Sequence, residues 1–251
     1  MQSKGQITFD KKLSLGEELI VIGTNNENLI LWNLRKGGAV TISDSGARLF
    51  RARVTTIGKT SSMLLVFEDT GFEKTNLRVI LLQALPEKER MELIIQKTTE
   101  LGVHRIIPFK SEKSTSLKER DLKQEKSLRW EDVALKAAKQ SRRPDIPEIV
   151  PYCAFKEAIS FCDKTSLKIM LKQGSGIMSL KEFLKNIPPL ANGRNEAALL
   201  VGPEGGFSEE EAQEAEKAGF TGVSLGSSIL RTETAAIIGV GIMRYELDTG
   251  A

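Results

Sequence analysis

The spacing of apolar residues changes once along this 251-residue chain, near Leu77. Before that point, short β-branched or alternating runs are separated by turn residues, which is typical of an all-β unit. After it, short apolar runs alternate with longer segments whose apolar residues recur every three or four positions. That second pattern is typical of an α/β domain built on a parallel sheet. The change therefore predicts two units of different architecture.

The all-β unit is expected within residues 1–70. Its predicted strands cover residues 7–9, 18–22, 29–34, 39–42, 49–57 and 63–67. Several short strands in so short a segment favour a small barrel, because closing the sheet protects its edges. The polar residues 68–76 predict a linker to the second unit, which is expected to cover residues 77–251.

In the second unit, the continuous apolar run at residues 78–84 predicts a strand that is buried on both faces. Further strands are expected at residues 104–109, 148–150 and 168–171, and two more precede the loops that begin near Gly202 and Gly226. The predicted helices lie between and after these strands, at residues 87–101, 120–141, 155–161, 180–184, 209–218 and 234–247.

Composition excludes several classes of protein. The chain is 40% hydrophobic and 27% charged, as in ordinary globular proteins. No apolar run is long enough for a transmembrane helix, and residues 1–6 lack the apolar segment of a signal peptide, so we expect a cytoplasmic protein without membrane contact. Cys153, Cys162 and His104 are the only residues of their types. A chain with only these two cysteines and one histidine is expected to have neither a disulfide framework nor a metal site.

Positive charge is concentrated in residues 110–143, which hold 11 Lys or Arg against 6 Asp or Glu. Acidic residues are interspersed through the middle of this stretch, which is typical of a solvated helix face. The ends, residues 110–113 and 139–143, are less diluted and favour phosphate contacts.

A glycine-containing loop follows the apolar residues that end at Val201. Glycines in this loop permit tight turning and close approach of a ligand. Ser208 and Glu211 have the spacing of a capping box that opens the next helix. Glu204 and the acidic residues 209–211 would repel phosphate, so a neutral or cationic ligand is favoured, and a sulfonium such as S-adenosylmethionine satisfies that argument. A purely structural turn is an equal alternative at this point.

A second loop runs from Leu225 into the last predicted helix. Thr232 is the expected N-cap of that helix. Arg231 could bind an anion, or could form an ordinary surface pair with Glu233. Glycines inside the helix are unfavourable by about 1 kcal/mol each relative to alanine, so Gly239 and Gly241 predict close packing against another element.

These motifs carry a family resemblance. The run GPEGGFS from Gly202 to Ser208, followed by LGSSILRTETA from Leu225 to Ala235, resembles the signature of SPOUT-class methyltransferases that methylate N3 of a uridine in 16S ribosomal RNA. Residues 95–103, 111–114 and 138–142 are similar to that family as well.

The resemblance implies an α/β fold. A C-terminal SPOUT-type, trefoil-knotted parallel sheet with helices, its knot within about residues 197–251, would follow a small PUA-like β-barrel that binds RNA. It also implies an S-adenosylmethionine-dependent enzyme that acts as a homodimer. The expected partner is 16S ribosomal RNA within the 30S subunit.

The resemblance also assigns roles to residues. The cofactor would be held, mostly through backbone groups, by Leu171, Lys172, Gln173, Val201, Gly202, Pro203, Glu204, Gly205, Gly206, Leu225, Gly226, Ser227, Ile229, Leu230 and Thr234. RNA contacts are expected from Arg35, Lys113, Gln140, Arg142, Arg143 and Arg231. Arg231 would stabilise the developing uridine anion. Glu233 is a candidate base, or a group that orients Arg231.

Several positions depart from the family pattern, and they bear on RNA contacts more than on the cofactor loops. They are Leu29, Asn33, Lys113, Lys139 and Ser228. Two further functions therefore stay open, namely methylation at another RNA position and an rRNA-binding module without activity. Another adenine-containing cofactor is a third alternative.

Overall fold

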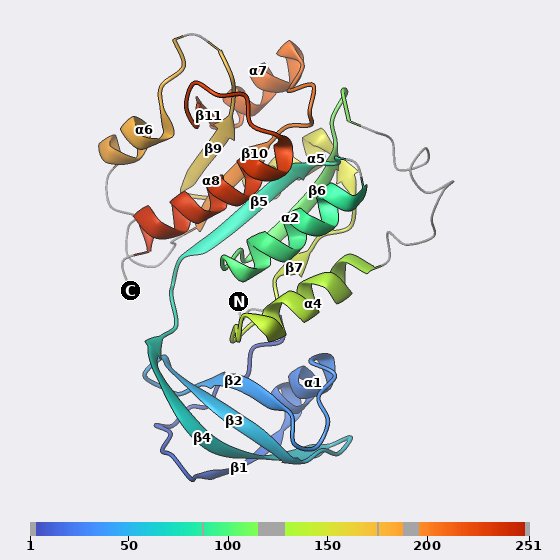
Figure 1. The fold of residues 1–251 in the computed structure, drawn as a ribbon, viewed down its shortest axis with the longest axis vertical. Helices are drawn as coiled ribbons and strands as arrows, with labels where there is room; N and C mark the ends of the chain where they lie inside the picture. Colours follow the sequence, from blue (N-terminus) through green and yellow to red (C-terminus); the bar gives the residue numbers. More distant parts are fainter. Residues whose placement is uncertain (1–3, 87, 115–128, 175, 188–195, 249–251) are drawn as a thin grey trace. The chain divides into compact units, whose positions relative to one another are not determined.

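The computed structural model describes residues 4–86, 88–114, 129–174, 176–187 and 196–248, and Figure 1 draws them as a ribbon. Internal contacts divide the chain into two compact units. Among the described residues, the first contains those up to Asn76 together with Ala134–Pro147, and the second contains those of Leu77–Val133 and Glu148–Asp248. The segment at Ala134–Pro147 therefore packs with residues that lie far from it in sequence.

The first unit is built on one antiparallel sheet with the strand order β1-β4-β3-β2. Its strands are β1 (Glu18–Ile22), β2 (Ala39–Ser43), β3 (Arg48–Thr56) and β4 (Ser61–Glu73). A single parallel bridge from Thr8 to Ser43 brings the N-terminal segment against β2. The predicted antiparallel β-structure is confirmed, whereas its closure into a PUA-like barrel stays a prediction.

The strand predicted at residues 29–34 is wrong, because helix α1 (Gly23–Leu31) occupies the first three of these residues and a turn follows it. Leu29 is fully buried in the helix and Trp32 is buried directly after it. Asn26 is also buried, and its side-chain amide donates to the carbonyl oxygens of Gly58 at 3.2 Å and Lys59 at 3.0 Å. These partners lie more than thirty residues away, so local sequence patterns carry no trace of them.

The linker predicted at residues 68–76 is also wrong over most of its length, because β4 continues to Glu73. The polar residues of this stretch pair with β3 across the sheet. Arg48 Nη2 lies 2.7 Å from Asp69 Oδ2, and Arg51 is the register partner of Glu68. Polar composition here indicates charge pairing between strands.

The second unit contains the predicted parallel sheet, and the fold class is confirmed as α/β with a separate antiparallel sheet. The strand order is β11-β9-β10-β5-β6-β7, with β8 paired to β6. The strands are β5 (Arg78–Ala84), β6 (Arg105–Lys110), β7 (Glu148–Ile149), β8 (Cys153–Ala154), β9 (Leu167–Leu171), β10 (Glu196–Val201) and β11 (Thr221–Val223). Strand β10 thus lies between β9, the strand that precedes it along the chain, and β5, which begins more than one hundred residues earlier. A knot in this unit stays a prediction of the resemblance.

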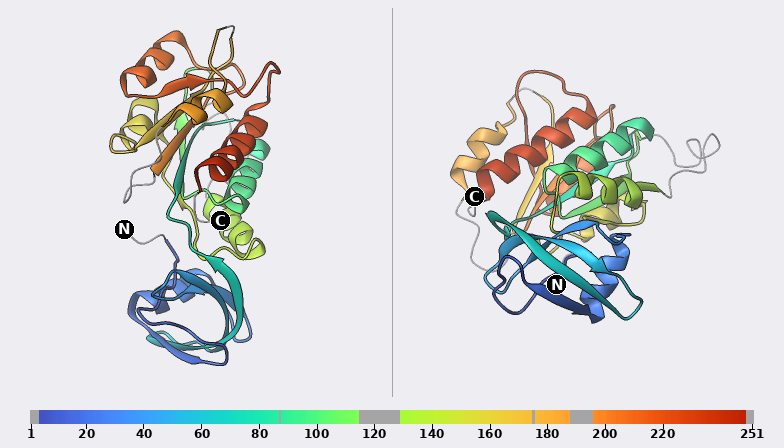
Figure 2. Two further views of the ribbon diagram at one scale, coloured as in Figure 1. Left: turned by 90° about the vertical axis from the view of Figure 1, so that its left-hand side faces the viewer. Right: turned by 60° about the horizontal axis from the view of Figure 1, so that its bottom comes forward.

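Helices pack on both faces of the parallel sheet. They are α2 (Lys88–Glu100), α5 (Phe155–Ser160), α6 (Leu180–Asn186), α7 (Glu209–Lys217) and α8 (Thr232–Leu247). Figure 2 shows α2 and α8 beside each other on one face, and α8 contacts β10 and β5. Residues of α5 and α7 form a buried core with the other face. Helix α4 (Trp130–Gln140) begins after residues 115–128, so the first part of the predicted helix at residues 120–141 lies outside the described residues. Among the described residues, no helix has the length and apolar character needed to cross a bilayer.

Gly239 allows α8 to approach the sheet closely, as the sequence predicts for a glycine within a helix. A Cβ built on Gly239 would lie 2.7 Å from Leu199 Cδ2 on β10, whereas one on Gly241 would meet only Leu101 at 3.8 Å. We expect Gly239→Ala to lower the free energy of unfolding by roughly 1–2 kcal/mol, because overpacking outweighs the gain in helix propensity. Gly241→Ala is the matched control, and it should be neutral or stabilising by up to about 1 kcal/mol. Urea denaturation measures both, and equal stabilisation by the two substitutions would contradict this account.

Candidate cofactor and active site

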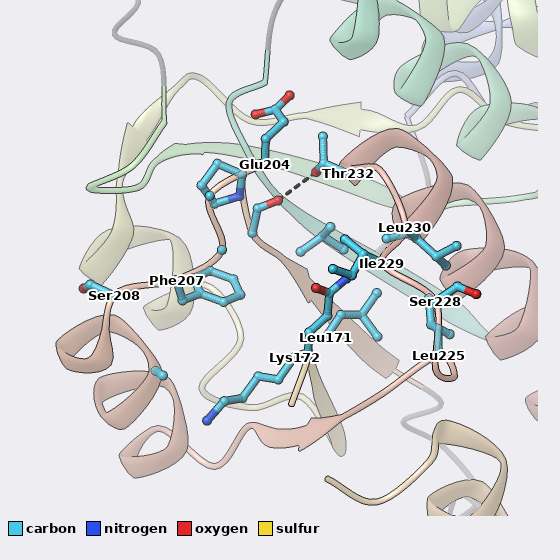
Figure 3. Close-up of a pocket in the computed structure, with 18 of the residues that line it drawn as sticks. Leu171, Lys172, Glu204, Phe207, Ser208, Leu225, Ser228, Ile229, Leu230 and Thr232 are labelled. Carbon is cyan, nitrogen blue, oxygen red and sulfur yellow. Dashed lines mark hydrogen bonds between the residues drawn. The ribbon is translucent and has the colours of Figure 1, made fainter. Parts of the chain in front are cut away.

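A cavity of about 550 Å³ opens where β9 and β10 end and where the chain leaves β11. In open α/β sheets, ligands bind at the carboxyl ends of the strands, because loops from neighbouring strands meet there. Three loops line the cavity, at residues 171–173, 201–209 and 225–232. Figure 3 shows their side chains converging from these separate segments.

Most of the residues that the sequence assigned to cofactor binding lie together in this cavity. Thirteen of the fifteen line it, whereas Ser227 and Thr234 are not among the lining residues. Sequence reasoning missed seven lining residues, namely Phe207, Ser208, Glu209, Ala212, Ser228, Thr232 and Ala235. The first four continue the glycine loop into the first turns of α7, so the capping box at the start of that helix was the signal for them.

Two glycines in the first loop pack closely against neighbours within the protein. A Cβ on Gly202 would lie 3.2 Å from the Phe207 ring, and one on Gly205 would lie 3.3 Å from Lys113 Cβ. Gly206 has a φ of 68°, a left-handed conformation that side chains disfavour. The conformation at Gly206 and the close packing at Gly202 and Gly205 therefore favour glycine in this loop independently of any ligand.

Thr232 is not the N-cap of α8, because Arg231 occupies that position without a side-chain cap bond. The hydroxyl of Thr232 is buried and joins the two loops instead. It donates to the carbonyl oxygen of Gly202 at 2.7 Å, drawn as a dashed line in Figure 3, and accepts from Gln83 Nε2 at 3.0 Å. A capping role is excluded because the hydroxyl is committed to the backbone of the other loop.

Glu211 connects the first loop to residues 111–112 through hydrogen bonds. The predicted capping box with Ser208 is present. The same carboxylate also accepts from Ser111 Oγ at 2.9 Å and from the backbone N–H of Glu112 at 2.9 Å. Glu211 is buried, so these bonds satisfy its charge inside the protein.

Lys113 lies against the same loop. Its Nζ donates to the carbonyl oxygens of Gly205 at 3.3 Å and Phe207 at 3.4 Å. Lys113, which the sequence predicts to contact RNA, is therefore bonded to the backbone of the glycine loop in the structure. Together with Glu211, it fastens residues 111–114 to the cavity wall.

The charge of Glu204 does not face the cavity, contrary to the argument made from its sequence position. Its Oε1 lies 2.6 Å from Arg90 Nη1 on α2. In Figure 3, the Glu204 side chain points away from Leu171 and Ile229. The charge of Glu204 therefore no longer favours a cationic ligand, because Arg90 balances it.

Arg231 and Glu233 lie at the start of α8, next to lining residues of the cavity but not among them. Arg231 is exposed. The Glu233 side chain is only 13% exposed, and its Oε2 lies 4.0 Å from Arg90 Nε. That oxygen accepts no hydrogen bond from the described residues. Arg90 thus stands between the acidic residues of both loops.

The other predicted RNA contacts, Arg35, Gln140, Arg142 and Arg143, belong to the first unit. The first three are exposed. Arg143 differs, because its side chain is only 9% exposed and its Nη2 lies 2.9 Å from Asp145 Oδ1. Arg143 is therefore held in an internal ion pair.

Comparison with known proteins agrees with this architecture. The family model for an RNA methyltransferase domain matches residues 73–244. Ribosomal RNA small subunit methyltransferase E of Mesomycoplasma hyopneumoniae (strain 232) is 36% identical over 167 residues, which are 66% of this chain and 69% of that protein. The protein of the same name from Bacillus subtilis (strain 168) is 28% identical over 200 residues, 79% of this chain and 78% of its own.

A solved structure is similar over nearly the whole length of this chain. It is the crystal structure of a ribosomal RNA small subunit methyltransferase E from Neisseria gonorrhoeae bound to S-adenosyl methionine. The two proteins are 28% identical with a TM-score of 0.64, and the match covers 95% of this chain and 96% of that one. On the match of the family model and the identity to its curated relative, this chain belongs to the ribosomal RNA small subunit methyltransferase E family of RNA methyltransferases.

Proposed function

We propose that this protein transfers a methyl group from S-adenosylmethionine to N3 of a uridine in 16S ribosomal RNA. The observation that carries the proposal is the convergence of the two signature loops on one cavity at the carboxyl ends of parallel strands. Relatives named for small-subunit ribosomal RNA methylation and a neighbour bound to S-adenosyl methionine support it.

The residues present fit this cofactor. The cavity of about 550 Å³ falls within the usual range for small-molecule sites. Leu171, Leu225 and Ile229 offer apolar surface for an adenine ring, and the loop backbone offers polar groups that fix its orientation. When bound, the cofactor supplies an activated methyl group on a sulfonium.

The target nitrogen sets the task of the chain's own residues. N3 of uridine lies on the Watson–Crick edge, so the base must be unpaired or extruded before it can react. N3 also carries a proton, which must be lost as the new bond forms. Arg231 is exposed at the edge of the cavity, and its positive charge would stabilise the resulting uridine anion.

Glu233 has two candidate roles in this scheme. Its Oε2, which accepts no hydrogen bond from the described residues, could accept the proton from N3. Alternatively, its carboxylate could orient Arg231, with Arg90 holding it at 4.0 Å. Much of the rate enhancement would come from positioning the two reactants.

The proposal includes a homodimer that works in the cytoplasm, with residues 1–70 as the RNA-binding domain and residues 77–251 as the methyltransferase domain. Apolar side chains on the neighbouring helices α2 and α8, and directly after α2, support the dimer. Leu93, Leu101, Ile238 and Tyr245 are all exposed, and Tyr245 is 86% exposed. Apolar groups left in water on adjacent elements favour a protein interface.

Methyl transfer tests the function directly. We would incubate the purified dimer with labelled S-adenosylmethionine and 30S particles from a strain lacking its own enzyme, and identify the modified nucleoside by mass. N3-methyluridine is the expected product, and free 16S RNA in parallel identifies the preferred substrate. A different methylated nucleoside would indicate another RNA position. Cofactor binding without methylation of any RNA would indicate an inactive binding module, and failure to bind the cofactor would point to another ligand.

A further inference from the structure

A row of polar side chains crosses three strands of the first unit. Thr41 on β2 is the register partner of Arg51 on β3, and Arg51 is the partner of Glu68 on β4. Direct partners in an antiparallel sheet place their side chains on the same face. Arg51 Nη1 donates to Thr41 Oγ1 at 2.9 Å, so its guanidinium is held within this row.

Arg142 is fixed against the same row, although it lies about ninety residues further along the chain. Thr41 Oγ1 donates to the carbonyl oxygen of Arg142 at 2.7 Å. Arg142 Nη1 lies 3.8 Å from Glu68 Oε1. Thr41 and Glu68 therefore bring two arginines to one place on the sheet.

The backbone at Arg142 supports a specific role. It has a φ of 56°, in the left-handed region that normally favours glycine just after a helix. Non-glycine residues in this region are strained, and such strain tends to be retained at functional sites. The strained turn is held by the hydrogen bond from Thr41, and its side chain remains 68% exposed.

The charges of this group do not cancel. Arg51 and Arg142 carry two positive charges against the single negative charge of Glu68, which leaves one positive charge. Burial, together with the charge of Arg142, lowers the pKa of Arg51 from its ordinary value, while Glu68 opposes that shift. Lys139, in the last turn of α4, adds a further positive charge nearby in sequence. Arg143 does not contribute, because Asp145 balances it.

We propose that Arg51 and Arg142 together bind one phosphodiester of the substrate RNA. Arg51, Arg142 and Glu68 together leave one positive charge, which complements the single negative charge of a phosphodiester, and Lys139 adds to the positive charge of this segment. Guanidinium groups present planar pairs of N–H donors that suit phosphate oxygens. The inference rests on the proposed function, and it adds Arg51 to the RNA contacts predicted from sequence.

We call Arg51 and Arg142 the arginine clamp, and the salt dependence of RNA binding tests it. Affinity for purified 16S ribosomal RNA would be measured by filter binding over a series of salt concentrations, for wild type, Arg51→Ala, Arg142→Ala and the double variant. Each single variant should bind several-fold more weakly at about 0.1 M salt and lower the slope of log K against log salt by about 0.7–0.9. The double variant should lose no more slope than a single one, because both arginines hold the same phosphate.

Arg53→Ala is the matched control. Arg53 lies two residues along β3 on the same face, where its guanidinium stands 5.3 Å from the centroid of the Phe67 ring. Arg53→Ala should leave the slope of log K against log salt unchanged. Arg51→Lys retains a charge at the site and should restore most of the slope, which a loss of folding would not permit.

Three outcomes would overturn the clamp. If Arg51→Ala and Arg142→Ala match Arg53→Ala while the wild type binds and methylates RNA, the clamp is wrong and the proposed function stands. If the double variant loses about two units of slope, the arginines hold separate phosphates. If the wild type neither binds 16S RNA nor methylates 30S particles, the clamp and the proposed function fail together.

Discussion

Arg231→Ala is expected to lower kcat for methyl transfer by about 100- to 1000-fold, the usual effect of removing one group that stabilises a developing anion. The dissociation constant for S-adenosylmethionine should stay near the wild-type value, because the exposed Arg231 side chain does not line the cavity. Single-turnover rates with 30S particles measure the chemical step, and calorimetry measures cofactor binding.

Arg231→Lys is the matched variant for this experiment. Lysine keeps the positive charge but loses the planar pair of donors. It should recover part of the rate if charge is what matters, while KM for the particle reports any loss of RNA contact. Wild-type turnover by Arg231→Ala, with intact cofactor binding, would exclude a catalytic role for Arg231. Positioning of the two reactants would then be left as the explanation of the rate enhancement.

Among the substitutions considered, Glu211→Ala should lower stability most, and it should also weaken cofactor binding markedly. Its removal deletes the capping box of α7 and leaves the buried hydroxyl of Ser111 and the part-buried N–H of Glu112 without their acceptor. Loss of a cap and of hydrogen bonds to a buried charge should together lower the free energy of unfolding by about 3 kcal/mol. Because the same contacts fasten the glycine loop, we also expect weaker binding of S-adenosylmethionine.

Glu210→Ala is the control for that substitution, since Glu210 is the exposed neighbour on the same helix. Its effect on urea denaturation and on cofactor affinity should be small, as for most surface substitutions. Glu211→Gln retains one carbonyl acceptor and should fall between the two. A Glu211→Ala protein as stable as Glu210→Ala, with unchanged cofactor affinity, would contradict the role assigned to these contacts.

The candidate site was largely accessible from sequence because its parts are local motifs that resemble a family signature, and that resemblance assigned the cofactor residues. The cavity loops are short segments between an apolar strand and a helix start, and their chemistry depends on glycines and a cap within a few residues. Thirteen of the predicted cofactor residues consequently meet in one cavity. What local patterns could not show is which charges are already balanced. Arg90, the partner of Glu204, is 114 residues away.

The sequence by itself determined the change from antiparallel to α/β architecture near Leu77 and the capping box at Ser208, because each depends on neighbouring residues or on a simple period. Only the tertiary structure decided that residues 23–31 form a helix, that Thr232 bonds Gly202, and that the turn at Arg142 lies against β2. The physical reason is the same in all three cases. Buried polar groups must find partners, and the partners they find are often distant in sequence.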